Sequence, residues 1–444
     1  MQKKHSRMML AAAGIVVAAL ATTGCATGAA PADSGEKVTV TFWQQQMEDF
    51  QQEWYKKNVD AYNASQDKIE VKLEVVPADV WPQKLATAQA SGTAPDITTI
   101  NYGKIGEGVP NGEYLALDEV LPAASLDDLK PNIREFVTID GKAYAYPVNV
   151  EASKLLYYRT DLVKAAGLDP NSPPKTWDDL IVWAKALTQG NVQGIAEAAN
   201  ATDLAWSTWG LQWNACDHTA IDDDWAEGLA TDPCFQELAN FYRTLYQDNL
   251  MPQSPKTGYS DPAPYINGEV AMMDNGSWAF ASLKADAPDV LANTAVAAFP
   301  SMSGAPSETT ATLGGWALAI DSKTKYAQQA GDFVNWLAAD GTERMVDYFT
   351  ISNFARFTAR TSVEEALKGV KGADDPIVQT ISNDVVSFAK HEPAYPFDIS
   401  MAIGTAIETA MKTDTDLGAA FQTADDSIND VIAKQSLAGA NPFK

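Results

Sequence analysis

Residues that bind metals or cross-link chains are scarce in this sequence of 444 residues. Cysteine and histidine occur three times each, and no two cysteines have the CxxC spacing of a zinc site. The sequence contains no repeating unit, which argues against a repetitive structural protein of the cell wall. No GxSxG motif is present, which argues against a serine hydrolase of the α/β class. We therefore expect no bound metal and no cofactor.

Basic residues are also scarce relative to acidic ones. Lysine and arginine number 32 against 58 aspartates and glutamates, so the formal net charge is −26 at pH 7. Phosphate backbones and anionic headgroups repel such a chain, which makes nucleic acid and anionic membrane surfaces poor partners. The length allows a sizeable buried core and predicts two or three domains of about 100–200 residues each.

The apolar run near the N-terminus is too short to span a bilayer. Basic residues precede it, it covers residues 8–21, and a run of small residues then ends at Cys25. A transmembrane helix needs about 20 residues, whereas this pattern resembles a bacterial lipoprotein signal. We expect residues 1–24 to be removed as a signal peptide, Cys25 to carry the lipid, and residues 25–35 to form a flexible tether.

Cys216 and Cys234 are the two cysteines that remain for the folded region. Exported proteins can form disulfides, so we expect these two to be paired. Closing the loop between them stabilises a fold by about 3 kcal/mol in the chain-entropy model. Metal binding is the weaker alternative, because only His218 and His391 lie outside the signal as nitrogen ligands.

The residues after the tether have the pattern of an α/β layered lobe. Apolar residues alternate over 38–43 and again over 69–76, and they recur at helical spacing between these two segments. Two strands joined by a helix run parallel. A further helix over 80–89 and a strand over 95–100 extend the pattern, which predicts an α/β fold class.

Later segments add a crossover strand and three helices. Residues 143–150, AYAYPVNV, are predicted to be extended, and Pro147 at their middle favours an edge or crossover position because proline cannot donate to a ladder. The spacing of apolar residues predicts helices over 327–338, 399–411 and 417–432.

The stretch 267–280, NGEVAMMDNGSWAF, predicts a strand, a turn and a helix that opens with tryptophan. Asn275-Gly276 is the turn signal, Ser277 is the expected N-cap, and Trp278 begins the helix. A flat ring at such a junction of an open α/β sheet lies at the mouth of the cleft where ligands bind. The alternative is a tryptophan of the core.

Six motifs follow one another in a set order along the first three quarters of the chain. They are VTFW at 40–43, PDI at 95–97, GKAYAYPVNVEASKLLYYRTDL at 141–162, PPKTWDDL at 173–180, NGEVAMMDNGSWAF at 267–280 and LGGWALAI at 313–320. The ordered set resembles the extracellular sugar-binding proteins of ABC importers, the group that includes maltose-binding protein.

The resemblance implies a two-lobe periplasmic-binding-protein-like fold with a hinge and a ligand cleft between the lobes. The first α/β lobe would comprise residues 36–149 and 319–357. The second would comprise residues 150–318 and 358–444. The cleft residues contributed by 354–397 do not follow from the resemblance.

The resemblance also implies a set of ligand-binding residues. Glu151 follows the YP crossover, where maltose-binding protein has a glutamate that bonds sugar hydroxyls. Trp278 matches the stacking tryptophan of GSW, and Trp206 lies where the family often has an aromatic platform. The remaining expected contacts, some placed by the second crossover and some by position after a strand, are Gly315, Trp316, Asn101, Gln44, Gln45 and Asn149.

Two neighbouring predictions concern residues outside this set. Trp209 and Trp213 recur with Trp206 at helical spacing, so we expect both in the core. Asp96, in the PDI motif, is expected to fix a loop rather than to contact ligand.

Aromatic rings and amides together suit a carbohydrate. Pyranose rings present apolar faces and hydroxyl edges, so a site needs flat rings as well as groups that donate and accept hydrogen bonds. The resemblance implies a non-catalytic protein that captures a carbohydrate, expected to be an oligosaccharide, and delivers it to the permease subunits of an ABC importer. We expect a monomer, held by its lipid anchor at the extracellular face of the bacterial cell membrane.

Two other functions stay open at this point. A secreted glycoside hydrolase would need two carboxyl groups about 5–9.5 Å apart, and the many acidic residues allow such a pair, although only Glu151 falls in a matched position. An amino-acid or peptide binder would need buried charges for the ligand's termini. Arg356 and Arg360 lie in the segment that the resemblance does not reach.

Overall fold

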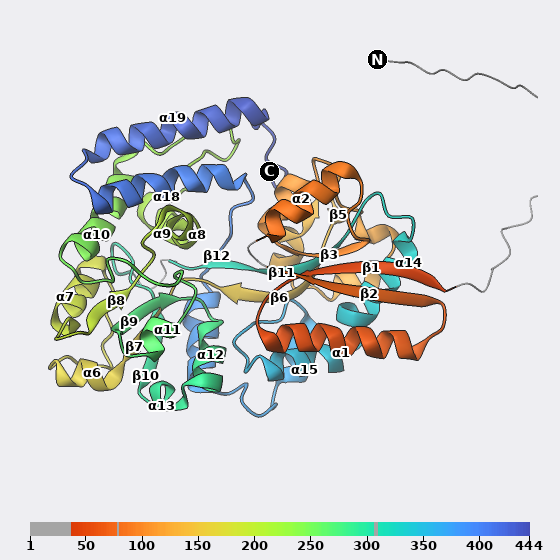
Figure 1. Ribbon diagram of the computed structural model, residues 1–444, viewed down its shortest axis with the longest axis horizontal. Coiled ribbons are helices and arrows are strands. Elements are labelled where there is room, and N and C mark those ends of the chain that lie inside the picture. Colours follow the sequence, from red (N-terminus) through yellow and green to blue (C-terminus); the bar gives the residue numbers. More distant parts are fainter. Residues whose placement is uncertain (1–36, 78–79, 306–309) are drawn as a thin grey trace, which may run out of the picture.

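The protein has the α/β fold that the sequence predicts, built on two main β-sheets and a small sheet of two strands, β4 (Thr138–Ile139) and β5 (Lys142–Ala143) (Figure 1). The computed structural model describes residues 37–77, 80–305 and 310–444. The expected signal peptide, the tether up to residue 35 and Cys25 lie outside the described residues. None of the described helices combines the length and the apolarity needed to cross a membrane.

Three parallel strands with helical crossovers begin the first sheet. They are β1 (Val38–Gln45), β2 (Ile69–Val76) and β3 (Ile97–Asn101), and α1 (Asp49–Ser65) and α2 (Trp81–Ser91) connect them. β1 lies between β2 and β3 and pairs parallel with both. The alternating apolar residues of β1 point into the core, as their spacing predicts. The order strand, helix, strand, helix, strand is also the predicted one.

Antiparallel strands complete the first sheet and carry the chain toward the second. β11 (Thr312–Ile320) pairs antiparallel with β3 and with β6 (Tyr146–Ala152), and it pairs parallel with β12 (Lys390–His391). Among the described strands β6 pairs with β11 alone, and an isolated bridge joins its Val150 to Phe357, so Pro147 occupies an edge strand as predicted. In Figure 1 these strands run through the middle of the molecule, between the two groups of helices.

The second sheet has four strands in the order β10, β7, β9, β8. They are β7 (Leu155–Arg159), β8 (Gln193–Ala196), β9 (Val270–Asn275) and β10 (Thr294–Ala298). β7 follows β6 after only two residues, so the crossover passes directly from one sheet to the other. β9 pairs antiparallel with β7 and parallel with β8, and all six of its residues are buried.

A buried ion cluster fixes the crossover to the second sheet. The ammonium group of Lys154, which lies between β6 and β7, is 2.6 Å from a carboxylate oxygen of Asp274 and 3.0 Å from one of Glu197. Their side chains are at most 1% exposed. The ion pair between Lys154 and Asp274 therefore links the end of β6 to β9. Breaking it would leave a buried charge without compensation, which costs free energy.

Two long helices near the C-terminus pack on each other and on helices beside the second sheet. α18 (Phe397–Lys412) and α19 (Leu417–Gln435) lie side by side and match two of the helices predicted from the sequence (Figure 1). The third predicted helix is α14 (Ala327–Val334), which continues as a π-helical turn over Asn335–Ala339. Its expected apolar face, formed by Ala330, Phe333, Val334 and Leu337, is fully buried.

The other helices of at least six residues connect or cover the two sheets. They are α3 (Gly103–Gly108), α5 (Pro131–Phe136), α6 (Thr160–Ala165), α7 (Trp177–Leu187), α8 (Ala201–Ser207), α9 (Trp209–Cys216), α10 (Pro233–Gln247), α12 (Ala279–Asp286), α15 (Glu343–Ile351) and α16 (Thr361–Leu367).

Candidate functional site

Trp278 lies at the junction between β9 and α12, where the sequence predicts a ligand contact. Its ring is half-buried, and its indole Nε1 donates to the carbonyl oxygen of Ser260 at 3.1 Å. The ring folds back over Gly276, because a Cβ atom added to Gly276 would lie only 1.9 Å from Cζ3 of Trp278. The backbone of Gly276 therefore lies against one side of the ring, and the half-buried ring also packs against the apolar core.

Ser277 does not cap the following helix, so this prediction is wrong. α12 begins at Ala279 after Trp278, and no side chain caps it. Ser277 instead pairs with the end of β6: its amide donates to the carbonyl oxygen of Ala152 at 2.8 Å, and its hydroxyl accepts from the amide of Ala152 at 3.3 Å. The loop that carries Trp278 is thereby tied to the crossover between the sheets.

Tyr259 is a neighbour of this loop that the sequence reasoning missed. Asn275 donates from Nδ2 to the carbonyl oxygen of Tyr259 at 3.0 Å, and the amide of Tyr259 donates to Asp203 at 3.2 Å. Burial, followed by the charges of Asp274 and Glu392, raises the pKa of Tyr259. Its hydroxyl therefore stays protonated and can donate a hydrogen bond at the site.

Glu151 is held by an arginine that the sequence reasoning did not place. Its Oε1 accepts from Nε of Arg356 at 2.7 Å, and the same guanidinium contacts Glu48. The Arg356 side chain is 2% exposed. Burial raises the pKa of Glu151, while the positive charge of Arg356 opposes that rise. Glu151 can accept a hydrogen bond from a ligand hydroxyl, but it does so as a member of a fixed ion pair.

Two of the predicted amides lie buried in the first sheet with polar atoms to spare. Asn149 accepts from the hydroxyl of Tyr348 at 3.0 Å, and its Nδ2 has no partner among the described residues. Gln44 is fully buried, and neither Nε2 nor Oε1 of its side chain has a hydrogen-bond partner among the described residues. Because a buried polar group without a partner costs free energy, such groups are suited to bond a hydroxyl that reaches them.

The other two polar residues of the predicted set are less free. Asn101 accepts through Oδ1 from the amide of Lys104 at 3.1 Å, which fixes the start of α3. Gln45 lies half-buried at the end of β1, where its backbone N–H donates to the hydroxyl of Thr99 at 3.0 Å. Their role as ligand contacts stays a prediction.

Gly315 and Trp316 lie on the central strand β11 at the second crossover. Gly315 has a φ of 135°, and a Cβ atom there would lie 2.2 Å from the carbonyl oxygen of Asn149. Only glycine fits this position. Trp316 pairs with Asn101 on one side and with Asn149 on the other, and it is the only half-buried residue of an otherwise buried strand.

Trp206 belongs to a group of rings at the end of α8. Its ring centroid is 4.5 Å from that of Phe397 and 5.1 Å from that of Trp209. Trp209 is 4% exposed and donates to Ser400, so its predicted place in the core is confirmed. Trp213 is half-buried and lines a pocket, so its expected place in the core is wrong.

Asp96 fixes a loop, as predicted. One carboxylate oxygen accepts from the amide and the hydroxyl of Thr41, each at 2.7 Å, and the other accepts from Thr324. These bonds join β1 to the residues that follow β11.

Glu392 is the second acidic residue at the crossover and was not predicted. Its amide donates to the carbonyl oxygen of Leu313 at 3.0 Å, which extends the pairing of β12 along β11. Its carboxyl lies against Gly314, where a Cβ atom would come 1.9 Å from Oε1. Burial, followed by the charge of Glu151, raises the pKa of Glu392 to about 8. The residue follows a two-residue strand, which leaves no periodic signal in the sequence.

A pocket of about 490 Å³ opens beside Glu392. Its walls come from the end of α5 and the residues after it, from α9 and the chain after it, from residues 391–395, and from the C-terminal segment 441–444. Aromatic side chains from these segments, Phe136, Trp213, Trp225 and Phe443, line it. None of the nine predicted ligand residues is among the lining residues. Glu392 lines the pocket, and its carboxyl lies against Gly314, next to the predicted Gly315.

Two relatives of this chain are named as binding proteins. A probable ABC transporter-binding protein of Deinococcus radiodurans is 27% identical over 64% of this chain and 68% of its own length. A mannitol-binding protein of Pseudomonas aeruginosa is 26% identical over 69% of this chain and 70% of its own length.

A solved structure shares the fold. An ABC transporter solute-binding protein of Thermotoga lettingae, bound with alpha-D-tagatose, superimposes with a TM-score of 0.75 at 21% identity. It covers 89% of this chain and all of its own. This likeness confirms the predicted two-lobe α/β fold.

The family model for bacterial extracellular solute-binding proteins matches residues 57–380, which is most of the chain. The match takes in the second sheet, the strands β2, β3, β6 and β11 of the first sheet, and the loop that carries Trp278. This chain belongs to the bacterial extracellular solute-binding protein family.

Proposed function

We propose that this protein captures a carbohydrate, expected to be an oligosaccharide, and delivers it to the permease of an ABC importer. The observation that carries the proposal is the arrangement at the crossover. The half-buried ring of Trp278, oriented by Gly276 and Ser260, lies on a loop tied to Ala152, one residue from Glu151. A ring face and hydroxyl-binding groups at one place are what a pyranose requires.

The buried amides add to this support. Gln44 and Asn149 carry donors and acceptors that no described residue uses, and Tyr102 donates to the backbone of Asn149 at 3.0 Å. Groups able both to donate and to accept suit hydroxyls, which also do both. The names of similar proteins agree with this chemistry, because mannitol and tagatose are rich in hydroxyl groups.

The protein is proposed to bind without catalysis. Members of the family are solute-binding proteins. Glu151, the carboxylate in the best-matched position, is engaged by Arg356 rather than free to transfer a proton. Incubation with labelled oligosaccharides should leave them intact, and cleavage products would contradict this part of the proposal.

A lipid on Cys25 is proposed to hold the protein at the outer face of the cell membrane as a monomer. Cys25→Ala should release the protein from membranes and leave ligand affinity unchanged, because the tether and the cleft are separate. Membrane association that persists in this variant would contradict the anchor.

A ligand screen tests the function. Purified protein is heated in the presence of mono- and oligosaccharides, and amino acids and short peptides serve as the comparison set. A ligand at 100 times its dissociation constant stabilises by about 2.7 kcal/mol, which gives a clear rise in Tm. Stabilisation by a saccharide, confirmed by calorimetry, supports the proposal. Stabilisation by amino acids or peptides alone would overturn it.

A further inference from the structure

Two glutamates flank one glycine across three neighbouring strands at the crossover. Glu151 on β6 pairs with Gly314 on β11, and Glu392 follows the β12 residue that pairs with Leu313. Residues in register on adjacent strands point to the same face of a sheet. Gly314 has no side chain to separate them, and the carboxyl of Glu392 occupies the space where its Cβ would be. The two carboxyl groups therefore share one side of the hinge.

The two glutamates differ in their partners. Glu151 has the guanidinium of Arg356 at 2.7 Å. No side-chain hydrogen bond or ion pair joins the carboxyl of Glu392 to another residue in the described part of the chain. A half-buried carboxyl beside a second carboxyl, without a cation, is disfavoured in its charged form. Burial and the charge of Glu151 therefore raise the pKa of Glu392 to about 8.

The pocket that Glu392 lines does not supply the missing cation. Its rim carries further carboxylates, among them Glu135, Asp222 and Asp223. Lys444, which lines it, is paired with Asp224, and the ammonium group of Lys390 lies over the ring of Trp213, 5.2 Å from its centroid. His391 stacks on Phe136 at 4.3 Å, and burial lowers its pKa, which favours the neutral ring.

We propose that the ligand carries the cation: the cleft takes an amine-bearing carbohydrate whose ammonium group pairs with Glu392. Its ring can stack on an aromatic side chain that lines the same pocket, such as Phe443. Cations are also attracted to aromatic faces, so the two features of the pocket act together. The inference rests on the proposed function and adds the class of sugar.

Binding of an ammonium group changes the protonation of the site. The carboxyl of Glu392 gives up its proton to solvent, and the carboxylate that forms pairs with the ligand's ammonium group. Binding at neutral pH therefore releases a proton for an amine-bearing sugar. A neutral sugar, which leaves Glu392 protonated, releases none.

Matched sugars provide the test. Glucosamine, galactosamine and the β-1,4-linked dimer and tetramer of glucosamine are compared by calorimetry with their N-acetylated forms, which have the same skeletons without the charge. We expect at least one amine form to bind the wild type about tenfold or more tighter than its acetylated partner. Its binding enthalpy should differ between two buffers of unlike ionisation enthalpy, which reports proton release. Glu392→Gln should reduce the preference to about twofold or less.

Glu113→Gln is the matched control. Glu113 is another half-buried glutamate whose pKa is raised by burial and by a neighbouring glutamate, and it does not line the pocket. Its removal should leave the preference for the amine form intact. Melting curves of both variants without ligand show whether each is folded.

The outcomes separate this inference from the proposed function. Equal or tighter binding of every acetylated form, or a preference that survives in Glu392→Gln, overturns the amine proposal and leaves carbohydrate binding standing. Binding of none of these sugars also overturns it, while the wider screen decides the function independently.

Discussion

The indole of Trp278 lies against the backbone of Gly276, two residues before it in the chain. A Cβ atom on Gly276 would lie within 2.3 Å of three atoms of the ring. The contact requires glycine at this position, and it holds the ring in one orientation together with the bond to Ser260. The turn signal Asn275-Gly276 thus also determines how the ring of Trp278 lies.

Gly276→Ala should weaken ligand binding although every proposed contact residue is kept. The added methyl group forces the ring of Trp278 away, since rings and Cβ atoms do not approach this closely. We expect a loss of about tenfold in affinity, equivalent to about 1.4 kcal/mol, measured by calorimetry with the ligand from the screen. Unchanged affinity in a folded variant would show that the orientation of the ring is unimportant.

Trp278→Ala should lower affinity much more than stability. We expect at least a tenfold loss of affinity, with a smaller decrease in the free energy of unfolding than a core tryptophan would show. Trp54 is the control, because it is 1% exposed, and replacing a core tryptophan by alanine typically costs about 3–5 kcal/mol. Unchanged affinity with a large loss of stability would return Trp278 to the core.

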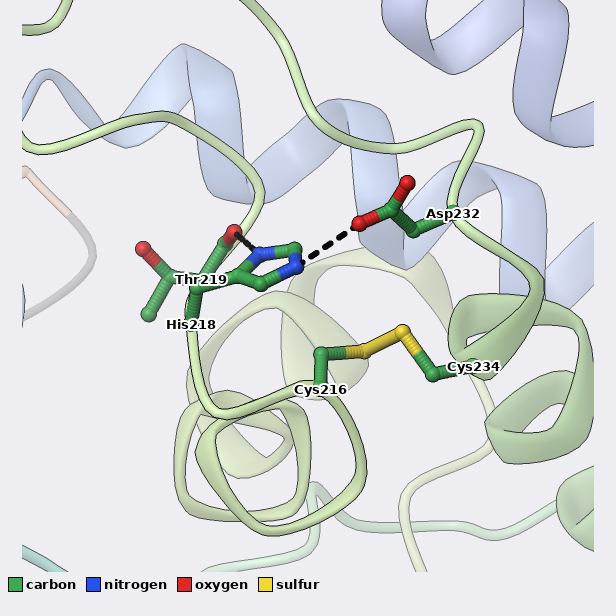
Figure 2. The surroundings of a disulfide bond; sticks show 5 residues. All are labelled: Cys216, His218, Thr219, Asp232 and Cys234. Atoms are coloured by element: carbon green, nitrogen blue, oxygen red, sulfur yellow. Dashed lines mark hydrogen bonds and ion pairs between the residues drawn. A yellow bond between two sulfur atoms is a disulfide. The ribbon is translucent and has the colours of Figure 1, made fainter.

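The Cys216–Cys234 disulfide should stabilise the second sheet's helices without contributing to binding. The structure joins the two cysteines, which lie at the end of α9 and near the start of α10, with their Cα atoms 5.5 Å apart (Figure 2). Neither lines the pocket. Cys216→Ala with Cys234→Ala should lower the free energy of unfolding by about 3 kcal/mol in the chain-entropy model. Mass spectrometry of protein made under oxidising conditions should show no free thiols at these positions.

The buried Arg356 should be needed for stability because it compensates Glu48 and Glu151. Arg356→Met leaves a buried carboxylate without its partner, a change that typically costs about 3–5 kcal/mol. Denaturant unfolding at neutral pH measures the loss. Adding Glu151→Gln should recover part of it, since the uncompensated charge is then removed. Arg134→Met is the control, because its ion pair with Asp127 is exposed and such pairs contribute about 1 kcal/mol or less. Equal losses in the two variants would contradict the role of burial.

Local sequence patterns predict the elements of this fold well. Alternation marks β1 and β2, a proline marks the edge strand β6, and helical spacing marks α18 and α19. These signals depend on residues close together in the chain. The exact start of a helix does not follow so directly, as the misplaced cap at Ser277 shows. There the hydroxyl bonds a residue 125 positions away instead of its own helix.

The site could be predicted only in part, for the same reason. Trp278 and Glu151 belong to segments with recognisable order, whereas Arg356 reaches Glu151 from 205 positions away. Glu392 lies after a strand of two residues, too short to show a period. Which ionisable groups face one another depends on how the two sheets meet at β11, and single-sequence patterns carry little of that information. The division of the chain between the lobes likewise stays a prediction.

The pH dependence of stability should reveal the unpaired carboxyl of Glu392. In the unfolded chain this group ionises near its ordinary pKa of 4.5, whereas in the folded protein the pKa is about 8. Between these values the folded state binds more protons, so folding stability decreases as the pH rises from about 4.5 to 8 and levels off above that. Glu392→Gln removes this decrease. We expect the urea midpoints of wild type and Glu392→Gln to diverge steadily from pH 5 to pH 8, with the variant the more stable at pH 8. The Glu113→Gln control should follow the wild type far more closely. Parallel curves for wild type and Glu392→Gln would show that the carboxyl is well solvated or paired, and that the crossover holds no uncompensated charge.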